Sequence, residues 1–374
     1  MDLRTARVEN CPPDETSPGW KIELCDQGTW LSRLWVVDRD IRIGGSVLRV
    51  GGISSVETPK EHRGKGLAAK AMEGALALMG NEGYAVSLLH GIPDYYHRFG
   101  YAPCMPEYDL RIATADAERA PGPLALREIQ PGDLPAISRL YNGENARRTG
   151  TAQRDAETWK GFPRSVGWFT KPRVLAASDA KDRLVGYLVY DEVSGRCQVA
   201  EAGGQGGDVM GSILRFLAQR SVELRKEEIH FALPPDHPLA LYARKFGCQA
   251  EARYPRNGGF MGRIIRLHPF LESLAERLGR DGDYPLPAGE VALSTELGAA
   301  MLGFRGGKGF HDANAPKEGA VHLGQAALFQ MAMGYRSARD LLMAGDLTGP
   351  PEKVDLLCAW FPLRNATLYW PDRF

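Results

Sequence analysis

A short glycine-rich segment with two basic residues lies between an apolar run and an amphipathic stretch. Residues 63–68 read RGKGLA, after the apolar run Ser46–Val56 and at the start of the stretch Leu67–Met79. The run predicts a strand, and apolar residues at i, i+3, i+4 and i+7 in the stretch predict a helix. Unpaired N–H groups and the dipole at a helix start favour an anion, and glycines allow close approach of the backbone. We interpret residues 63–68 as a pyrophosphate-binding loop, with a plain loop as the alternative.

The elements that position this loop fall into three blocks, which we predict to be domains of residues 1–120, 121–268 and 269–374. The segment Ala120-Pro121-Gly122-Pro123 is typical of a linker. The second block repeats part of the first, with a helix at Val209–Arg220, a strand at Glu228–Leu233 and a second Phe-Gly pair, at residues 246–247. Its glycine-rich segment, residues 201–208, carries two acids and no basic residue. We therefore expect a degenerate copy that lines the acceptor cleft.

Composition narrows the classes of protein. The 374 residues suggest two or three domains, and 46 basic side chains balance 46 acidic ones, which argues against a nucleic-acid partner. The sequence has neither an apolar run of membrane-spanning length nor the apolar core of a signal peptide at its start. The six cysteines are far apart, with no C-x-x-C pair. We expect a cytoplasmic protein with reduced thiols, no membrane partner and no metal site.

Two motifs together resemble a known family. The pattern Arg-x-x-Gly-x-Ala follows Val56-Glu57-Thr58, and residues 95–101, YYHRFGY, come after the next predicted strand, Tyr84–Leu89. Both are similar to motifs of the GNAT acetyltransferases. The whole chain, up to its tail Asp372-Arg373-Phe374, resembles the enhanced-intracellular-survival (Eis) type. The resemblance implies an α/β (α+β) fold with two tandem mixed-sheet GNAT-like domains and a third, α+β domain like sterol carrier proteins.

The resemblance also implies a function. It indicates an acetyl-CoA-dependent N-acetyltransferase that acts on a primary amine, either of a small molecule or of a lysine side chain. It further implies self-association, as a hexamer. In the family, the end of one strand, the loop and the end of the next strand bind acetyl-CoA. The corresponding residues here are Val56, Glu57, Thr58, Arg63, Gly64, Lys65, Gly66, Leu67, Ala68, Ala69, Gly91 and Ile92.

The same resemblance implies two catalytic groups. Tyr96 corresponds to the general acid, because a phenol can protonate a departing thiolate. The C-terminal carboxylate of Phe374 corresponds to the general base, and the amine then attacks the thioester directly. The neighbouring Tyr95 is an alternative acid. His62 and His97 are alternative bases, although His62, at a helix entrance, has a position typical of a surface residue.

One departure and two other functions stay open. GNAT domains usually have one or two helices between their first two strands, but only about 20 residues, rich in proline and polar, precede the strand that starts at Trp20. Their absence would leave the acceptor side open, or filled by another block or subunit. The other functions are a non-catalytic acyl-CoA-binding scaffold and a lipid carrier with vestigial GNAT domains. Acetyl-CoA binding without turnover would favour the scaffold, and co-purified lipid without CoA affinity would favour the carrier.

Overall fold

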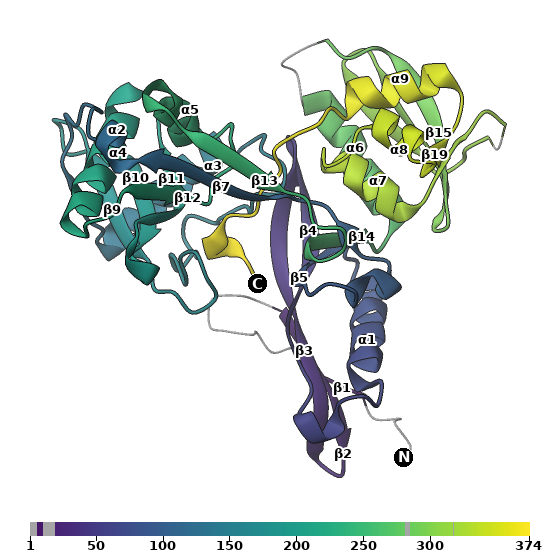
Figure 1. Cartoon of the computed structure of the whole chain (residues 1–374). Helices are drawn as coiled ribbons and strands as arrows, with labels where there is room; N and C mark the ends of the chain where they lie inside the picture. The colour runs from purple at the N-terminus through teal and green to yellow at the C-terminus, as the bar shows by residue number, and fades with distance from the viewer. Residues whose placement is uncertain (1–5, 10–18, 281–284, 317) are drawn as a thin grey trace.

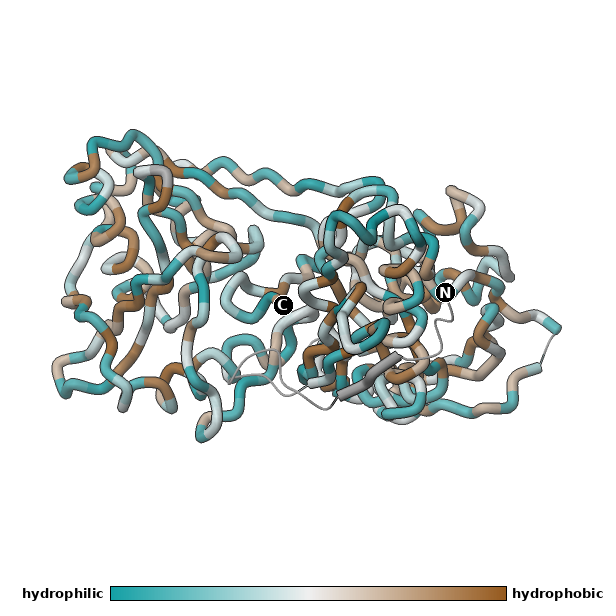
Figure 2. Tube along the Cα trace, turned by 90° about the horizontal axis from the view of Figure 1, so that it is seen from below, coloured by the Kyte–Doolittle hydropathy of each residue, from teal (hydrophilic) through white to brown (hydrophobic). Residues whose placement is uncertain are grey.

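The computed structural model describes residues 6–9, 19–280, 285–316 and 318–374. These residues form three sheets, each with helices packed against it (Figure 1). The first sheet forms a long stem, and the second and third sheets lie in two lobes on either side of its upper end. The C terminus lies between the second lobe and the stem, and the view from below shows the same placement (Figure 2).

The first sheet has the strand order β1-β2-β3-β4-β5-β14-β6, and its one parallel pair is β4 with β5. Helix α1 connects these two strands. Its buried residues recur on one face and pack on the sheet, which explains why the amphipathic stretch is helical. The elements are β1 (Ala6–Glu9), β2 (Gly19–Asp26), β3 (Thr29–Ile43), β4 (Ser46–Glu57), η1 (Lys60–His62), α1 (Leu67–Asn81), β5 (Val86–Gly91), η2 (Tyr96–Phe99), β6 (Ala102–Pro103) and β14 (Gly259–Ile264).

The second sheet repeats this plan, with the order β13-β7-β12-β11-β10-β9-β8 and one parallel pair, β11 with β12, connected by α4. Its strands are β7 (Glu107–Ala113), β8 (Leu126–Glu128), β9 (Arg173–Ser178), β10 (Leu184–Asp191), β11 (Gln198–Gly204), β12 (Glu228–Phe231) and β13 (Gln249–Arg253). Its helices are α2 (Thr114–Ala117), η3 (Pro131–Asp133), α3 (Leu134–Glu144), η4 (Val193–Gly195), α4 (Gly207–Glu223), α5 (Pro238–Ala243) and η5 (Arg244–Phe246).

The third sheet has the order β17-β16-β15-β18-β19. Its strands are β15 (Gly289–Thr295), β16 (Gly298–Arg305), β17 (Lys308–Asp312), β18 (Val321–Leu323) and β19 (Leu347–Thr348). The helices of this part are α6 (Leu267–Arg280), α7 (Gln325–Ala332), α8 (Ala338–Met343), α9 (Pro351–Trp360) and the short η6 (Trp370–Asp372) of the tail. Phe374 belongs to the same buried cluster as this lobe's helices and one face of the first sheet.

Two strands pair outside the block in which they lie in the sequence. Strand β7 pairs with β12 and β13 in the second sheet, and β14 pairs with β5 and β6 in the first. The first two blocks therefore exchange strands, and β7 and β13 form a ribbon that runs from the second lobe toward the stem (Figure 1). The domain boundaries at residues 120 and 268 stay predictions.

The structure places the glycine-rich segment of the second block, whereas another expectation falls outside the described residues. Residues 201–204 of this segment form the end of strand β11, and the Glu201 side chain is fully buried. Most of the segment before Trp20, on which the expected absence of helices rests, lies outside the described residues, as does Cys11. In the part of the chain that is described, no helix combines the length and the apolar character needed to cross a membrane.

Candidate functional site

The predicted phosphate loop connects η1 to α1. Gly64 and Gly66 have φ angles of 75° and 74°, and a Cβ atom on either residue would meet no other atom within 4 Å. Glycine is therefore required by the left-handed backbone and not by crowding. Gly66 is the N-cap of α1 and makes no side-chain cap, so the first N–H groups of the helix lack a capping side chain. An anion at this helix start would meet these N–H groups and the basic side chains of Arg63 and Lys65.

Strands β4 and β5 separate beside this loop. Their parallel pairing runs from Val50↔Val86 to Ile53↔Leu89, whereas β4 continues to Glu57 and β5 to Gly91. Ser55, with φ at 48°, interrupts the extended backbone of β4. Beyond the last pair, the facing polar backbone groups of the two strands are available to a bound molecule.

A cavity of about 550 Å³ lies at the strand ends. Arg63 forms part of its wall and donates from Nε to the carbonyl oxygen of Thr58 at 3.0 Å, which ties the loop to the end of β4. Seven of the predicted residues line the cavity, together with Tyr95, the alternative acid, and two residues that the prediction of the site did not include, Trp30 and Pro59. The seven are Val56, Glu57, Thr58, Arg63, Ala68, Ile92 and Tyr96.

The remaining predicted residues lie outside the cavity wall. Gly64, Lys65 and Gly66 are exposed in the loop, where an anion can reach their backbone. Leu67, the first residue of α1, is buried in the cluster between the helix and the sheet, and Ala69 packs against the same cluster. Gly91 is buried at the end of β5. His62 and His97 are not among the lining residues, and His97 is exposed.

Tyr96 is the buried phenol of this site. Tyr96 is the first residue of η2. Its ring packs against Gly91, where an added Cβ atom would lie 2.8 Å from Tyr96 Cδ2. Its ring makes an edge contact with Tyr95, with centroids 4.9 Å apart. Burial raises the pKa of Tyr96 to about 12, so the phenol keeps its proton at neutral pH. The nearby Tyr101 hydroxyl pairs with Ser87 Oγ at 2.7 Å and is thereby engaged elsewhere.

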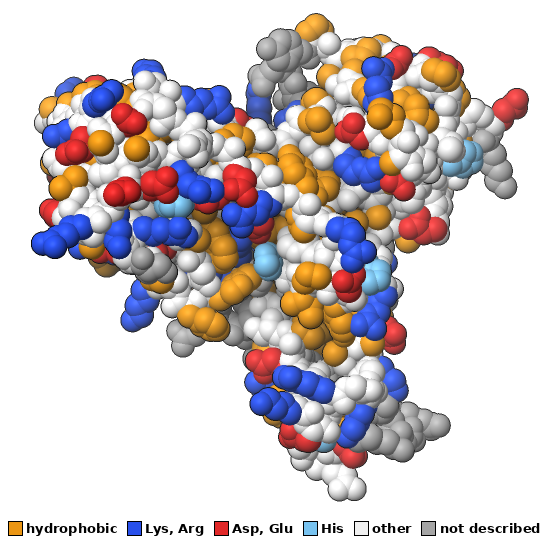
Figure 3. Space-filling view, in the orientation of Figure 1, with side chains coloured by type: hydrophobic (Ala, Val, Ile, Leu, Met, Phe, Trp, Pro, Cys, Tyr) orange, Lys and Arg blue, Asp and Glu red, His pale blue; other side chains and the backbone are white. Residues whose placement is uncertain are grey.

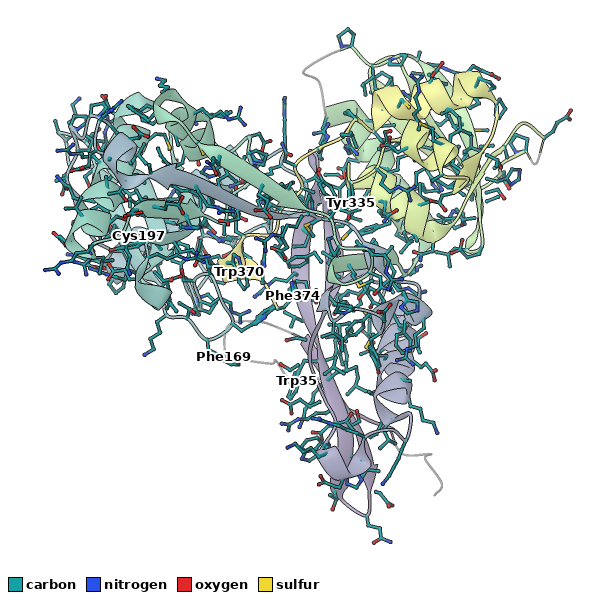
Figure 4. All side chains as sticks on the ribbon, in the orientation of Figure 1. Trp35, Phe169, Cys197, Tyr335, Trp370 and Phe374 are labelled. Carbon is teal, nitrogen blue, oxygen red and sulfur yellow. The ribbon has the colours of Figure 1, made fainter. Side chains whose placement is uncertain are left out.

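The end of the chain lies on the same sheet. A Cβ atom on Gly52 would be 2.6 Å from two carbon atoms of the Phe374 ring, so the ring packs directly on β4. Figure 4 shows Phe374 and Trp370 between the second lobe and the stem. Gly52 pairs with Leu88 of β5, and Leu88 and Phe374 share one buried cluster. Phe374 thus lies on one face of the β4–β5 pair whose separated ends border the cavity.

A histidine on the same face was missed by sequence reasoning. His90 follows Leu88 by two residues in β5, so both side chains point to the same face of the sheet. The His90 ring packs on Trp168 and Phe260, with centroids 5.8 and 5.4 Å away, and its Nε2 lies 3.3 Å from the Glu107 carboxylate. No spacing motif in the sequence marks His90, because its partners come from three distant segments.

Replacing Gly52 by alanine is expected to displace the tail. The added methyl group would overlap the Phe374 ring, and overpacking of this kind destabilises a protein by about 1–3 kcal/mol. The free energy of unfolding from urea denaturation measures the effect. Gly80→Ala in α1 is the matched control, because nothing lies within 4 Å of its added Cβ, and it should leave stability equal or slightly higher. Equal stability of the two variants would contradict the packing of Phe374 on Gly52.

Comparisons with known proteins agree with this geometry. Residues 10–104 match the model of a family described as an acetyltransferase (GNAT) domain. No curated protein matches the chain. Among solved structures, a GCN5-related N-acetyltransferase from Kribbella flavida has a TM-score of 0.74 at 19% sequence identity. The alignment covers 95% of this chain and 87% of that chain.

Two further structures are similar along nearly the whole length. A GCN5-related N-acetyltransferase from Anabaena variabilis has a TM-score of 0.76 at 18% identity, with 95% of this chain and 89% of that chain covered. Eis1 from Mycobacterium abscessus has a TM-score of 0.67 at 17% identity, with 95% and 90% covered. At these identities the likeness shows a shared fold. The predicted α/β fold with tandem GNAT-like domains is confirmed, and the family match over residues 10–104 confirms the predicted enzyme class, an acyltransferase.

Proposed function

We propose that this chain is an acetyl-CoA-dependent N-acetyltransferase of the Eis type, acting on a primary amine of a small molecule or of a lysine side chain. One observation carries the proposal. The cavity at the separated ends of β4 and β5 joins an uncapped helix start to the buried phenol of Tyr96. A pyrophosphate fits the helix start, and an extended thiol-bearing arm fits the space between strands with unpaired backbone groups.

The cofactor would be held mostly by the backbone. In this proposal the ends of β4 and β5 hold the arm of acetyl-CoA, through Val56, Glu57 and Thr58 on one side and Gly91 and Ile92 on the other. The loop and the first turn of α1 hold the pyrophosphate. The residues assigned to that contact are Arg63, Gly64, Lys65, Gly66, Leu67, Ala68 and Ala69.

Two groups would move protons. The neutral amine attacks the thioester carbonyl, so that a C–N bond forms and the C–S bond breaks. Tyr96 gives its phenolic proton to the departing thiolate, and the carboxylate of Phe374 accepts a proton from the nitrogen. Attack between two bound partners needs no covalent enzyme intermediate, because the site supplies proximity and orientation.

The resemblance supports three further expectations. We expect the chain to assemble as a hexamer and its third lobe to resemble sterol carrier proteins. We also expect the second lobe to contribute to the acceptor cleft. Hydrophobic side chains gather where the second lobe meets the stem, close to the end of the chain (Figure 3).

Titration calorimetry with acetyl-CoA tests the cofactor site. The wild-type chain should bind, and Arg63→Glu/Gly66→Asp should lose most of the affinity, because two acids replace a cation and the glycine that starts the helix. The matched control is Arg339→Glu/Gly345→Asp, which makes the same changes at an exposed arginine and at a glycine with φ at 77° in the third lobe. Equal binding by both double variants, or none by the wild type, would refute the site. Binding without turnover of any amine would favour a scaffold.

A further inference from the structure

The second sheet has a separated strand end like that of the first. Strand β11 pairs in parallel with β12 at Gln198↔His230 and Val199↔Phe231. Beyond Val199 it continues to Gly204 paired with β10 on its other edge, while β12 no longer pairs with it. In the first sheet the equivalent stretch of β4 borders the cavity. In the second sheet the chain's own groups occupy this place. His237 Nε2 donates to the carbonyl oxygen of Ala202 at 3.0 Å, and η6 of the tail packs against β11.

Tyr369 anchors the tail in the core of the second lobe. Its side chain is fully buried in the same cluster as β11 and α4, and its ring lies 6.1 Å from that of His237. Its hydroxyl donates to Asn145 Oδ1 at 3.3 Å. Burial lowers the pKa of His237 to about 3, so this imidazole stays neutral at physiological pH. Its hydrogen bond to Ala202 is therefore kept across this pH range.

A buried ion cluster connects β11 to the tail. Arg154 donates to both oxygens of the Glu201 carboxylate at 2.7 and 2.6 Å, and to both oxygens of Asp372 at 3.2 and 2.9 Å. The side chains of Arg154, Glu201 and Asp372 are 1%, 0% and 8% exposed. Two phenols complete the cluster, with Tyr187 donating to Glu201 at 2.7 Å and Tyr141 to Asp372 at 3.1 Å. Charges this deeply buried persist only when they are paired and hydrogen-bonded.

Arg154 also lies next to the segment through which the second block contacts the first sheet. The segment just before it pairs with the far end of β3, through Ile41↔Ala152 and through the Gln153 N–H, which donates to the Asp40 carbonyl at 2.8 Å. The guanidinium carbon lies 3.7 Å from the centre of the Tyr141 ring. One side chain therefore contacts the second sheet and the tail while its backbone adjoins the first sheet.

The next two residues of the tail continue to the stem. Arg373 donates to the Glu107 carboxylate at 2.9 and 3.3 Å, and Glu107 also lies beside His90. Arg373 and His90 hold the pKa of Glu107 at about 2, against the effect of burial, so this carboxyl is ionised at neutral pH. The Phe374 ring then reaches Gly52 on β4. Four anchoring residues, Tyr369, Asp372, Arg373 and Phe374, thus fix the path of the tail.

We propose that the separated strand end of the second sheet is a receptor for the chain's own C-terminal segment, Tyr369–Phe374. Glu201, Arg154 and Tyr141 are positioning residues that hold the Phe374 carboxylate on the first sheet through Asp372. The second lobe keeps the strand geometry of a cofactor groove and uses it to bind the tail. The binding of the tail by the second lobe is inferred from these contacts alone, whereas the effect of the tail on turnover rests on the proposed function.

Asp372→Asn tests the clamp with little risk to the fold. The change keeps the volume of the side chain and leaves the Arg154–Glu201 pair intact, whereas removing Arg154 would leave two buried carboxylates without a cation. Tyr141→Phe is the second variant, because it removes only one hydroxyl from Asp372. Asp355→Asn, at an exposed ion pair with Arg339 in the third lobe, is the matched control. Circular dichroism checks that each variant is folded. If Asp372→Asn does not fold, Tyr141→Phe becomes the variant that tests the proposal.

The direct readout is digestion by a carboxypeptidase that prefers aromatic C-terminal residues, followed by intact-mass spectrometry. Phe374 is only 7% exposed, so the wild type and Asp355→Asn should keep it. Asp372→Asn should lose it roughly tenfold faster or more, because cleavage follows the population of the opened tail and a charged hydrogen bond opposes opening. Tyr141→Phe should show a smaller increase in the same direction. Equal protection in the wild type and in both clamp variants, when folded, would overturn the receptor proposal.

Steady-state kinetics on undigested protein test the consequence for catalysis. In Asp372→Asn we expect kcat to fall roughly tenfold while KM for acetyl-CoA changes less than about twofold, since the carboxylate moves and the cofactor site does not. A variant that is merely less stable would not separate the two constants in this way. Faster loss of Phe374 with unchanged kcat would support the clamp and overturn the role of the carboxylate as base.

Discussion

Replacing Tyr96 by phenylalanine is expected to lower kcat by about 10²–10⁴-fold, because the departing thiolate loses its proton donor. Affinity for acetyl-CoA should change little, since the ring that packs against Gly91 stays in place. Calorimetry and steady-state rates on the same preparation separate the two effects. Tyr95→Phe is the matched control, because Tyr95 lines the same cavity with a more exposed ring. A larger loss in Tyr95→Phe would transfer the acid role to that residue.

The pH dependence of the wild type adds a check on this assignment. Burial raises the pKa of Tyr96 to about 12, so the phenol remains protonated, and able to donate, through the range in which the acceptor amine becomes neutral. The rate should therefore rise with pH as the amine loses its proton and show no tyrosine-dependent fall below about pH 10. A fall below that pH that disappears in Tyr96→Phe would contradict the raised pKa.

Adding two glycines after Phe374 is expected to reduce kcat by about 10²-fold or more, because the carboxylate is moved from its fixed place and general-base assistance is lost. The Phe374 ring is held against Gly52, so the added residues must pass beyond the present position of the carboxylate. Acetyl-CoA affinity, measured by calorimetry, should stay within about twofold, because the phosphate loop is untouched.

Phe374→Leu is the control for this extension. It keeps a terminal carboxylate at the same chain length and removes part of the ring packing, so its kcat should fall much less than that of the extended chain. Full activity of the extended chain would exclude the terminal carboxylate as the base. His90, on the same face of the sheet, would then be the next residue to replace.

Local patterns predicted the elements around the cofactor loop well. The spacing of Leu67, Ala71 and Met79 on one helix face, and the glycines at positive φ before them, depend only on neighbouring residues. The burial of Glu201 could not be predicted, because its partner is distant in the sequence. Its glycine-rich surroundings do not indicate a buried position in a strand. The cation that pairs with its carboxylate, Arg154, lies 47 positions away in the sequence.

Pairings between distant segments could not be predicted in this way. Nothing in the periodicity of β14 indicates that it pairs with β5 rather than with its own block, because both sheets accept the same alternating pattern. The partners of the tail are equally hidden, since Asp372 meets Tyr141 and Arg154 across more than 200 residues. The tail's last residue could be assigned a role by resemblance, whereas the cluster that holds the tail could not.

The strand exchange sets the order in which this protein can be completed during synthesis. The proposed cofactor loop of the first sheet, residues 63–68, comes early in the chain. Strand β14 of the same sheet is translated only after all the strands of the second sheet. Until residue 264 emerges, β5 has an open edge, and domain-by-domain folding from the N terminus cannot finish the first sheet. Phe374, which is translated after the strands of all three sheets, then packs on β4, one of the first strands made. A chain interrupted before Phe374 therefore contains residues 63–68 and the first strands but lacks this packing on β4.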